Sequence, residues 1–381
     1  MSKQPPSETL DALRANPQSA EKILVERLVT LAEARDPVLQ DLLMVAALPR
    51  SFDATTLAEL TGRVPAEAEF REAFSRLVAY PFVYERSDGQ LSLHDSIRQA
   101  LLERWQGQVL SGGDRDEHLR RLLSYYTRCY QQARIAAGAL ARVGPLMRRV
   151  NPARYGHAAE RTEELLVRPA IEALHVAMMI SPDEGRRWLE ATFWELEHER
   201  RYGLCGLLVS AFAEDADMVS PEARAWHKGW AAYFAARLAN ARMRWAEADQ
   251  HLGRVERFED VDLKLAAWTY IQKARGLRGQ CRFADAEAAL DRAIAIHDEH
   301  HTDDWNAWSP WSAKADVYQQ LWEPVREVAA RREALERATK AENFRVVVWQ
   351  LVSLVSALPA IGDLDGAARY LLDAVPAHGS I

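Results

Sequence analysis

The sequence predicts a mostly α-helical protein in which a small compact domain precedes an α-solenoid of repeated helix pairs. Tryptophans recur at steps of 38 to 42 residues through the C-terminal half, at Trp188, Trp230, Trp268, Trp308 and Trp349. A second landmark follows each Trp by roughly fifteen residues, where an aromatic or Leu residue stands three places before a small or branched one. A period near forty residues with two such landmarks is typical of helix pairs stacked into a solenoid.

Length and composition are those of an ordinary folded protein. The chain has 381 residues, a formal net charge of −7 and a pI near 5.9, so its overall charge gives no general attraction to nucleic acid or to acidic membranes. Cys129, Cys205 and Cys281 are far apart and fit reduced thiols. The N-terminus has no signal-peptide core, and no apolar run approaches the length of a membrane span. We therefore expect a cytoplasmic protein.

The first part of the chain predicts a loose lead-in over residues 1–19 and a compact domain over residues 20–108. Residues 20–34 have helical apolar spacing, with Ser19 as the N-cap. Further helices are expected over residues 38–48, 54–61, 67–80 and 95–105. Between the last two, Asp88-Gly89 joins two β-rich runs, which predicts a hairpin. Three helices followed by a hairpin make a winged helix.

Residues 20–107 resemble the winged-helix domain of bacterial STAND-class signalling NTPases, which are relatives of NB-ARC proteins. The resemblance rests on the runs LLMVAALPRSFDATTLAEL and LSLHDSIRQALLERW. It implies a winged helix followed by tetratricopeptide repeats. Leu93-His94-Asp95 resembles the MHD motif of that family, in which the His contacts nucleotide phosphates.

The sequence contains no phosphate-binding loop to accompany His94. No G-x-x-x-x-G-K-[ST] motif occurs, and no Gly is followed by Lys. His94 is therefore expected to be a structural residue that caps the junction between the hairpin and the next helix. We expect no bound nucleotide and no cofactor.

Winged helices also bind DNA, and this one has an acidic third helix. Glu67, Glu69 and Glu72 accompany Arg71 and Arg76, and residues 1–107 have a net charge of −4. Because neutralisation of phosphates supplies most of the affinity for DNA, these acidic side chains argue against DNA binding by this domain.

Residues 109–180 predict an Arg-rich helical bridge. Between residues 118 and 161 there are nine Arg and a single acidic residue, a net charge of +8. A helix is expected to about residue 137, followed by breaks at Gly138, Gly144-Pro145 and Asn151-Pro152 and a second helix over residues 156–180, with Pro169 as a kink or boundary. The candidate anion-binding residues are Arg142, Arg148, Arg149 and Arg154. The bridge either docks an anion, RNA or an acidic partner, or packs on the acidic solenoid beside it.

Residues 181–381 predict about five tetratricopeptide-like repeats. The helix pairs are expected at residues 182–200/202–213, 221–240/244–257, 261–279/283–299, 310–320/323–340 and 342–359/364–375. The runs MRWAEADQHLGRV and GQCRFADAEAALDRAIAI resemble the second helix of such repeats, where Ala248 and Ala286 would let two helices approach closely. Cys205 and Val325 depart from this pattern.

A solenoid's concave groove is its usual binding face, so partner-binding residues are expected on the first helix of each pair. The Trp ladder either fills the seams between repeats or lines this groove. The candidate contact residues are Tyr233, Arg237, Asn240, Arg275, Arg278, Trp305, Trp308 and Trp311. Because residues 162–381 have a net charge of −9, we expect a ligand with basic residues.

Catalytic and metal-binding patterns are weak. His297, His300 and His301 have helical spacing, but they stand where a helix runs into a polar loop. No Ser or Cys nucleophile comes with a recognisable partner, so we expect neither an enzyme nor a metal site.

The main hypothesis is a non-catalytic adaptor or sensor that binds a protein or peptide partner. By the STAND resemblance it would belong to a regulatory or defence complex, with an effector enzyme or ATPase on a separate chain. The alternative is a transcription regulator with a ligand-sensing solenoid and a winged helix or Arg bridge that touches nucleic acid.

Overall fold

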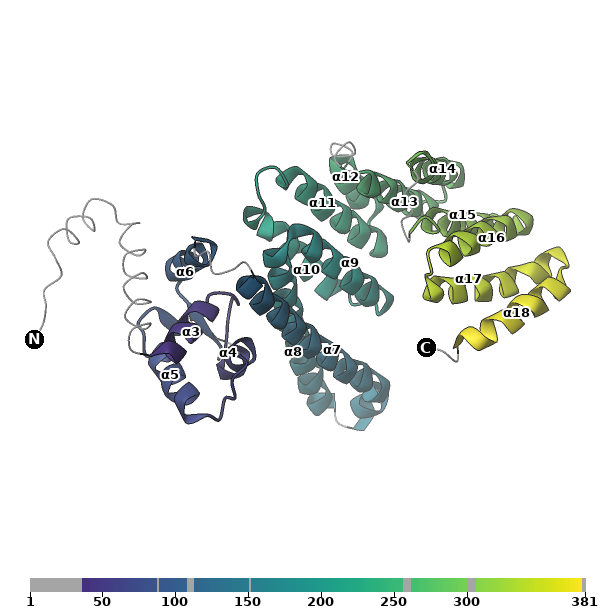
Figure 1. The fold of residues 1–381 in the computed structure, drawn as a ribbon. Helices are drawn as coiled ribbons and strands as arrows, with labels where there is room; N and C mark the ends of the chain where they lie inside the picture. The colour runs from purple at the N-terminus through teal and green to yellow at the C-terminus, as the bar shows by residue number, and fades with distance from the viewer. Residues whose placement is uncertain are drawn as a thin grey trace, which may run out of the picture. The chain divides into compact units, whose positions relative to one another are not determined.

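A computed structural model describes residues 36–87, 89–107, 113–150, 152–255, 262–300 and 306–378 (Figure 1). The chain divides into two compact units, residues 1–192 and 193–381. The predicted lead-in and the helix expected over residues 20–34 lie outside the described residues.

The described part of the first unit begins with three short helices, α3 (Pro37–Val45), α4 (Ala54–Thr61) and α5 (Ala68–Val78). The side chain of Asp36 accepts the Leu39 N–H at 3.0 Å, and that of Asp53 accepts the Thr56 N–H at 2.7 Å, so each carboxylate caps a helix N-terminus. Gly62 ends α4 in the left-handed conformation, with φ of 67°. These elements confirm the helices predicted from apolar spacing.

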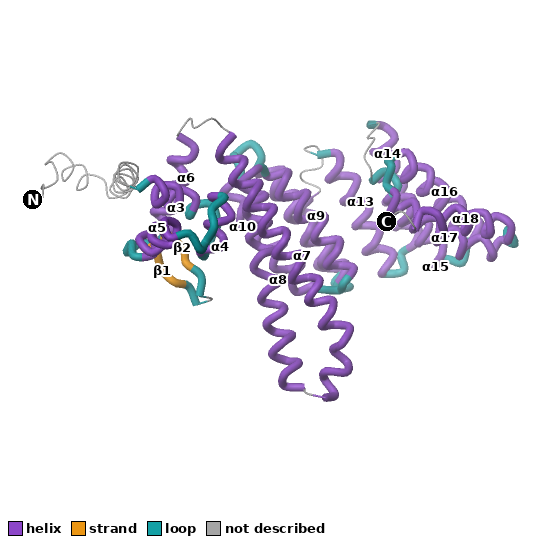
Figure 2. Tube along the Cα trace, turned by 60° about the horizontal axis from the view of Figure 1, so that its bottom comes forward, coloured by secondary structure: helices purple, strands orange, loops and turns teal. Residues whose placement is uncertain are grey.

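A two-stranded antiparallel sheet follows (orange in Figure 2), and it pairs Val83 of β1 (Val83–Glu85) with Leu93 of β2 (Leu91–Leu93). The chain then enters α6 (Asp95–Gly107). His94 stands at this junction and is exposed. Its N–H donates to the Phe82 carbonyl at 2.8 Å, and its carbonyl accepts the Arg98 N–H. The three helices, hairpin and fourth helix thus follow in the order that a winged helix has.

Two long helices, α7 (Gly113–Val150) and α8 (Pro152–Ile180), pack against each other as an antiparallel hairpin (Figures 1 and 2). The expected helix breaks at Gly138 and Gly144-Pro145 are wrong, because α7 runs through both. A Gly inside a helix costs only about 1 kcal/mol relative to Ala, which packing along a neighbouring helix offsets. Pro169 lies inside α8.

Buried polar groups join the hairpin to the small domain within the first unit. Arg98 donates to the Ala47 carbonyl at 3.0 Å and lies 2.9 Å from Nε2 of His175 in α8. The carboxylate of Glu172 accepts the Arg50 N–H at 3.2 Å. Burial raises the pKa of Glu172. The small domain and the hairpin therefore share one core, and the first compact unit extends beyond the boundary predicted after residue 180.

Five helix pairs follow, within a few residues of their predicted positions. Their bounds are α9 (Pro182–His198) and α10 (Tyr202–Glu214), α11 (Arg224–Ala241) and α12 (Trp245–Val255), α13 (Leu263–Gly279) and α14 (Phe283–Glu299), α15 (Ser309–Gln320) and α16 (Pro324–Lys340), and α17 (Phe344–Ala357) and α18 (Leu364–His378). Short 3₁₀ turns, η1 (Asp215–Met218) and η3 (Leu358–Ile361), follow α10 and α17. The predicted fold, a mostly α-helical chain ending in an α-solenoid, is confirmed.

The predicted small positions are buried where the repeat is regular. Ala248 and Ala286 have no exposed surface, and neither does Cys205 in the first pair. Val325 departs from this pattern, since it is 69% exposed. The buried apolar side chain near the start of α16 is instead Val328. Close helix packing therefore holds at the first three of these positions and shifts by three residues at the fourth.

The turns after the first helices share a left-handed residue. Arg200, Met243, Cys281 and Trp322 all have φ between 56° and 60°. In the turn at Trp322, the Glu323 N–H donates to the Tyr318 carbonyl at 3.0 Å, which closes the end of α15. None of the four is Gly, so each bears the steric cost of a side chain in this conformation.

We expect Trp322→Gly to raise the free energy of unfolding by about 1 kcal/mol, because Gly removes the left-handed strain. Little packing is lost, since Trp322 is 90% exposed. Urea denaturation of the variant beside Trp322→Ala, which keeps the strain, measures the effect. Equal stability of the two variants would show that the turn is unstrained.

His227 is fully buried in α11, and its Nε2–H donates to the Phe212 carbonyl at 2.7 Å. Burial lowers the pKa of His227 below its ordinary value near 6.5. The folded chain therefore keeps this ring neutral where the unfolded chain binds a proton. The stability that this supplies is complete above pH 6.5 and is lost as the pH falls toward the lower folded pKa.

The melting temperature should consequently fall more between pH 7.5 and pH 5.5 for the natural chain than for His227→Gln. The Gln side chain can still donate to the Phe212 carbonyl but does not titrate. A residual fall is expected in the variant, because burial also lowers the pKa of His251. An unchanged pH dependence in His227→Gln would contradict this assignment.

Residues Phe344–Ile361 are long and apolar enough to cross a membrane by length and composition, with a mean hydropathy of 1.7. The sequence reading missed this stretch because Arg345, Gln350 and two serines interrupt it. In the fold, α17 packs against both α16 and α18, and its Val346, Leu351 and Leu354 are buried. Packing inside the last helix pair accounts for these buried positions, whereas Phe344, Trp349 and Val352 of the same stretch are exposed.

Candidate partner-binding surfaces

The first helices of the pairs in the second unit form one layer, which we call the first-helix layer: α11, α13, α15 and α17. Helix α13 packs directly on both α11 and α15. Among the described residues, the second helices α12, α14 and α16 make no comparable contact with one another. Because the first helices lie closer together, their layer is on the inside of the curve, where a solenoid binds its partners.

Three of the predicted contact residues are buried within this layer. Tyr233, Arg237 and Asn240 are between 3% and 8% exposed. Arg237 donates to the Glu197 carboxylate at 2.6 Å, and the Asn240 amide donates to the Gln272 carbonyl at 2.9 Å. The expectation that these side chains face a groove is corrected, because they bridge neighbouring first helices instead.

Arg275 and Arg278, on the last turns of α13, are half-buried. Arg278 pairs with Asp316 of α15 at 2.8 Å, and Asp316 lies 3.6 Å from the buried Arg331 of α16. Among the described residues Arg275 has no ion-pair partner. Of the predicted arginines, Arg275 is therefore the one whose charge is available to a ligand, and its binding role stays a prediction.

The tryptophans of the ladder become more exposed along the solenoid. Trp230 and Trp268 are buried, and their rings meet edge to face at 5.6 Å. Trp308 is half-buried, and its ring lies 6.3 Å from that of Trp349, which is 47% exposed. The ladder thus fills seams at α11 and α13 and reaches the surface at α15 and α17.

The remaining predicted aromatics lie around α15. Trp311 is half-buried, with the Lys314 and Arg337 cations 5.7 and 5.6 Å from its ring centre. Trp305 lies outside the described residues. His297 is buried in α14 and His300 caps that helix, while His301 is also outside the described residues.

Sequence reasoning missed a cluster formed by α9 and α17. The Arg345 guanidinium lies 3.9 Å from the ring centre of Trp194, and the Trp194 ring also stacks on His198 with an interplanar angle of 1°. Trp194 is 41% exposed. No spacing in the sequence relates these residues, because only the path of the stacked repeats brings the first and fifth pairs together.

Charge is divided between the two layers of the solenoid. Helices α11, α13, α15 and α17 hold nine Lys and Arg residues and one acidic residue. Helices α12, α14, α16 and α18 hold eight basic and twelve acidic residues. The expectation of acidic surroundings, and hence of a basic ligand, is corrected, because the negative charge of this region lies on the second helices.

The Arg-rich bridge is the α7–α8 hairpin. Arg142 is exposed on α7. Arg148 and Arg149 lie near the end of α7 and Arg154 near the start of α8, but their side chains are outside the described residues. Their predicted role in anion binding stays a prediction.

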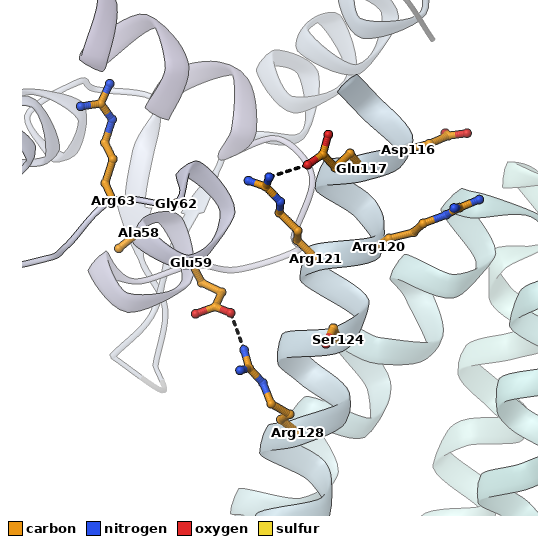
Figure 3. A pocket seen from close by; sticks show the side chains of 10 residues that line it. All are labelled: Ala58, Glu59, Gly62, Arg63, Asp116, Glu117, Arg120, Arg121, Ser124 and Arg128. Atoms are coloured by element: carbon orange, nitrogen blue, oxygen red, sulfur yellow. Dashed lines mark hydrogen bonds and ion pairs between the residues drawn. The ribbon is translucent and has the colours of Figure 1, made fainter. Parts of the chain in front are cut away.

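An open groove of about 1200 Å³ lies between α4 and α7 in the first unit (Figure 3). Its lining residues are Ala58, Glu59, Gly62, Arg63, Asp116, Glu117, Arg120, Arg121, Ser124 and Arg128. Two ion pairs lie in its walls: Arg121 pairs with Glu117 within α7, and Arg128 of α7 pairs with Glu59 of α4 across the groove. The sequence analysis counted the α7 arginines as part of the bridge, but it had no signal that would place them opposite α4.

No family model matches the sequence, and no curated protein matches it. A solved structure with a similar arrangement is a Signal Transduction ATPase with Numerous Domains (STAND) protein with a tetratricopeptide repeat sensor from Pyrococcus horikoshii, at 13% sequence identity and a TM-score of 0.40. The match covers 93% of this chain and 52% of that one, so this chain spans about half the length of that structure.

Proposed function

We propose that this protein is a non-catalytic adaptor or sensor that binds an acidic segment of a protein partner on its first-helix layer. The observation that carries the proposal is the charge of that layer, nine basic residues against one acidic residue. An exposed aromatic side chain, Trp349 of α17, accompanies these charges. Arg and Trp are the residue types that dominate binding energy at protein interfaces.

Arg275 is the anchor we assign to a ligand carboxylate. It is half-buried and, among the described residues, without an ion-pair partner, so a bound carboxylate would gain a charge-assisted hydrogen bond without breaking an existing pair. Arg237 and Arg278 differ, since each already neutralises a carboxylate of the protein. They would hold the layer together while Arg275 contacts the partner.

The transcription-regulator alternative has less support. Helix α5 would enter the DNA groove, yet Glu67 at its N-cap and Glu69 and Glu72 within it are exposed. Its Arg76 already pairs with Asp36 at 3.0 Å and with Glu72 at 2.5 Å. A surface of this charge would repel phosphates.

Fluorescence polarisation with labelled acidic, neutral and basic peptides of equal length tests the proposal on the full chain. Acidic peptides should bind best, and Arg275→Ala should weaken their binding on the order of tenfold. Arg292→Ala, on the exposed surface of α14, is the matched control and should bind normally. Tighter binding of basic peptides, or equal losses in both variants, would refute the proposal.

A further inference from the structure

The groove between α4 and α7 continues into a row of arginines along α7. Arg121, Arg128 and Arg142 are exposed, and they are separated by seven and fourteen residues. Seven residues make almost two helical turns, a rise of about 10.5 Å. The three guanidinium groups therefore leave nearly the same face of α7, and we call this face the arginine row.

The positions between these arginines leave the row accessible. Ser124, Gln131 and Gly138 stand three residues after Arg121, Arg128 and Ile135. A side chain added at Gly138 would meet nothing within 4 Å. Ile135 occupies the seven-residue position between Arg128 and Arg142 and is 73% exposed. The row thus combines positive charge at its two ends with one apolar contact between them.

We propose that the groove and the arginine row form a docking surface for an acidic α-helix of a protein partner. A helix packed along α7 presents the same face every seven residues, as in a coiled coil. Carboxylates seven and fourteen residues apart on such a helix meet Arg121, Arg128 and Arg142. An apolar residue at the position between them meets Ile135. This surface lies in the first unit and is separate from the first-helix layer.

A helical partner fits this pattern better than a nucleic acid does. Each DNA strand presents a phosphate about every 3.4 Å of helix axis, three times as densely as the arginines of the row are spaced. A phosphate backbone would also leave Ile135 without an apolar partner. Charge spacing and the exposed isoleucine therefore point to the same class of ligand.

The existing ion pairs do not block this surface. Arg121 and Arg128 pair with Glu117 and Glu59, but all four side chains are at least 40% exposed. Exposed pairs contribute little to stability and are readily exchanged. Arg142 has no ion pair among the described residues, so it gains a partner without losing one.

The test uses the full chain and a labelled helical peptide of about four heptads. On one face the peptide carries Glu, Glu, Leu and Glu at successive seven-residue positions, with Ala and Gln elsewhere. A second peptide has the same composition with these four residues scrambled, and a short mixed-sequence DNA duplex is the third probe. Fluorescence polarisation should show binding of the first peptide that is weakened by added salt.

Two variants probe the surface directly. Arg128→Ala combined with Arg142→Ala should weaken binding of the patterned peptide on the order of fivefold. Ile135→Glu should weaken it by about tenfold, because it places a like charge against the peptide carboxylates. Arg292→Ala and Arg275→Ala should leave the preference for the patterned over the scrambled peptide unchanged, because the two peptides carry the same charge and would bind equally to the first-helix layer. Circular dichroism checks that each variant folds.

The proposal is overturned if the patterned peptide fails to bind, or if the scrambled peptide binds as well. It is also overturned if the arginine and Ile135 variants bind normally. Tighter binding of the DNA duplex, lost in the arginine variants, would show that the row recognises phosphates instead. Loss of patterned-peptide binding in Arg275→Ala would place the peptide on the first-helix layer.

Discussion

Replacing Trp230 by Ala should lower the free energy of unfolding by about 3–5 kcal/mol, the usual cost of truncating a buried aromatic side chain. Trp230 has no exposed surface. Its ring contacts those of Trp226, Phe234 and Trp268, at centroid distances between 5.6 and 6.2 Å. Truncation therefore opens a cavity at the seam between α11 and α13, where neighbouring rings hold one another in place.

A hydrogen bond adds to this cost. The indole N–H of Trp230 donates to the Asp262 carboxylate at 2.9 Å, and Asp262 in turn accepts the Lys264 and Leu265 N–H groups that begin α13. Trp230→Phe keeps most of the ring but loses this donor, so it should cost only about 1–3 kcal/mol.

Guanidinium chloride denaturation of both Trp230 variants measures these costs, with Trp322→Ala as an exposed-tryptophan control. If Trp230→Ala cost no more than Trp322→Ala, the ring would not be part of the seam.

Removing the carboxylate of Glu197 should cost about 3–5 kcal/mol, because it leaves the buried Arg237 without its ion pair. The Arg237 side chain is 7% exposed, and two of its nitrogens donate to Glu197, at 2.6 and 2.9 Å. Its guanidinium also lies 4.8 Å from the ring centre of Phe193. The charge therefore cannot reach bulk water without a change in the packing of α9 and α11.

Glu197→Ala should for this reason melt at a much lower temperature than Glu197→Leu combined with Arg237→Leu, in which no buried charge remains. The comparison also separates the two roles considered for Arg237. A variant of a partner-binding residue would lose peptide binding at unchanged stability, whereas a variant of Arg237 should first lower the stability of the fold. Equal melting of the single and double variants would contradict the ion-pair assignment.

Local sequence patterns were sufficient for the helices and their pairing. Apolar spacing and the turn at Asp88-Gly89 predicted the elements of the small domain, whereas the capping roles of Asp36 and Asp53 came only from the structure. The Trp period predicted five helix pairs at nearly their observed bounds. These features succeed because caps, turns and amphipathic spacing act within a few residues of the chain. The continuous α7 is the exception, since contact with α8 offsets its glycines.

Local sequence patterns did not determine which side chains are buried and which are exposed. Trp230 and Trp349 occupy equivalent places in the repeat, yet Trp230 is covered by Trp268 of the next pair, whereas Trp349 is 47% exposed. Arg237 and Arg275 both lie six residues before the left-handed turn residue of their helices, at Met243 and Cys281. Glu197 on the neighbouring helix neutralises Arg237, whereas no described residue pairs with Arg275; Gly276 beside it packs closely on Asn240 of α11. The difference comes from the neighbouring helix, which the spacing does not specify.

The sequence by itself determined the order of elements, the repeat period and the richness of the α7 region in arginine, because each depends on residues close together in the chain. Only the tertiary structure decided which charges share a surface. Alternate helices of the solenoid fall into separate layers, so a region with a net charge of −9 has a basic first-helix layer. The contact of Arg345 with Trp194 and the groove between α4 and α7 likewise join residues far apart in sequence, and chain packing alone brings them together.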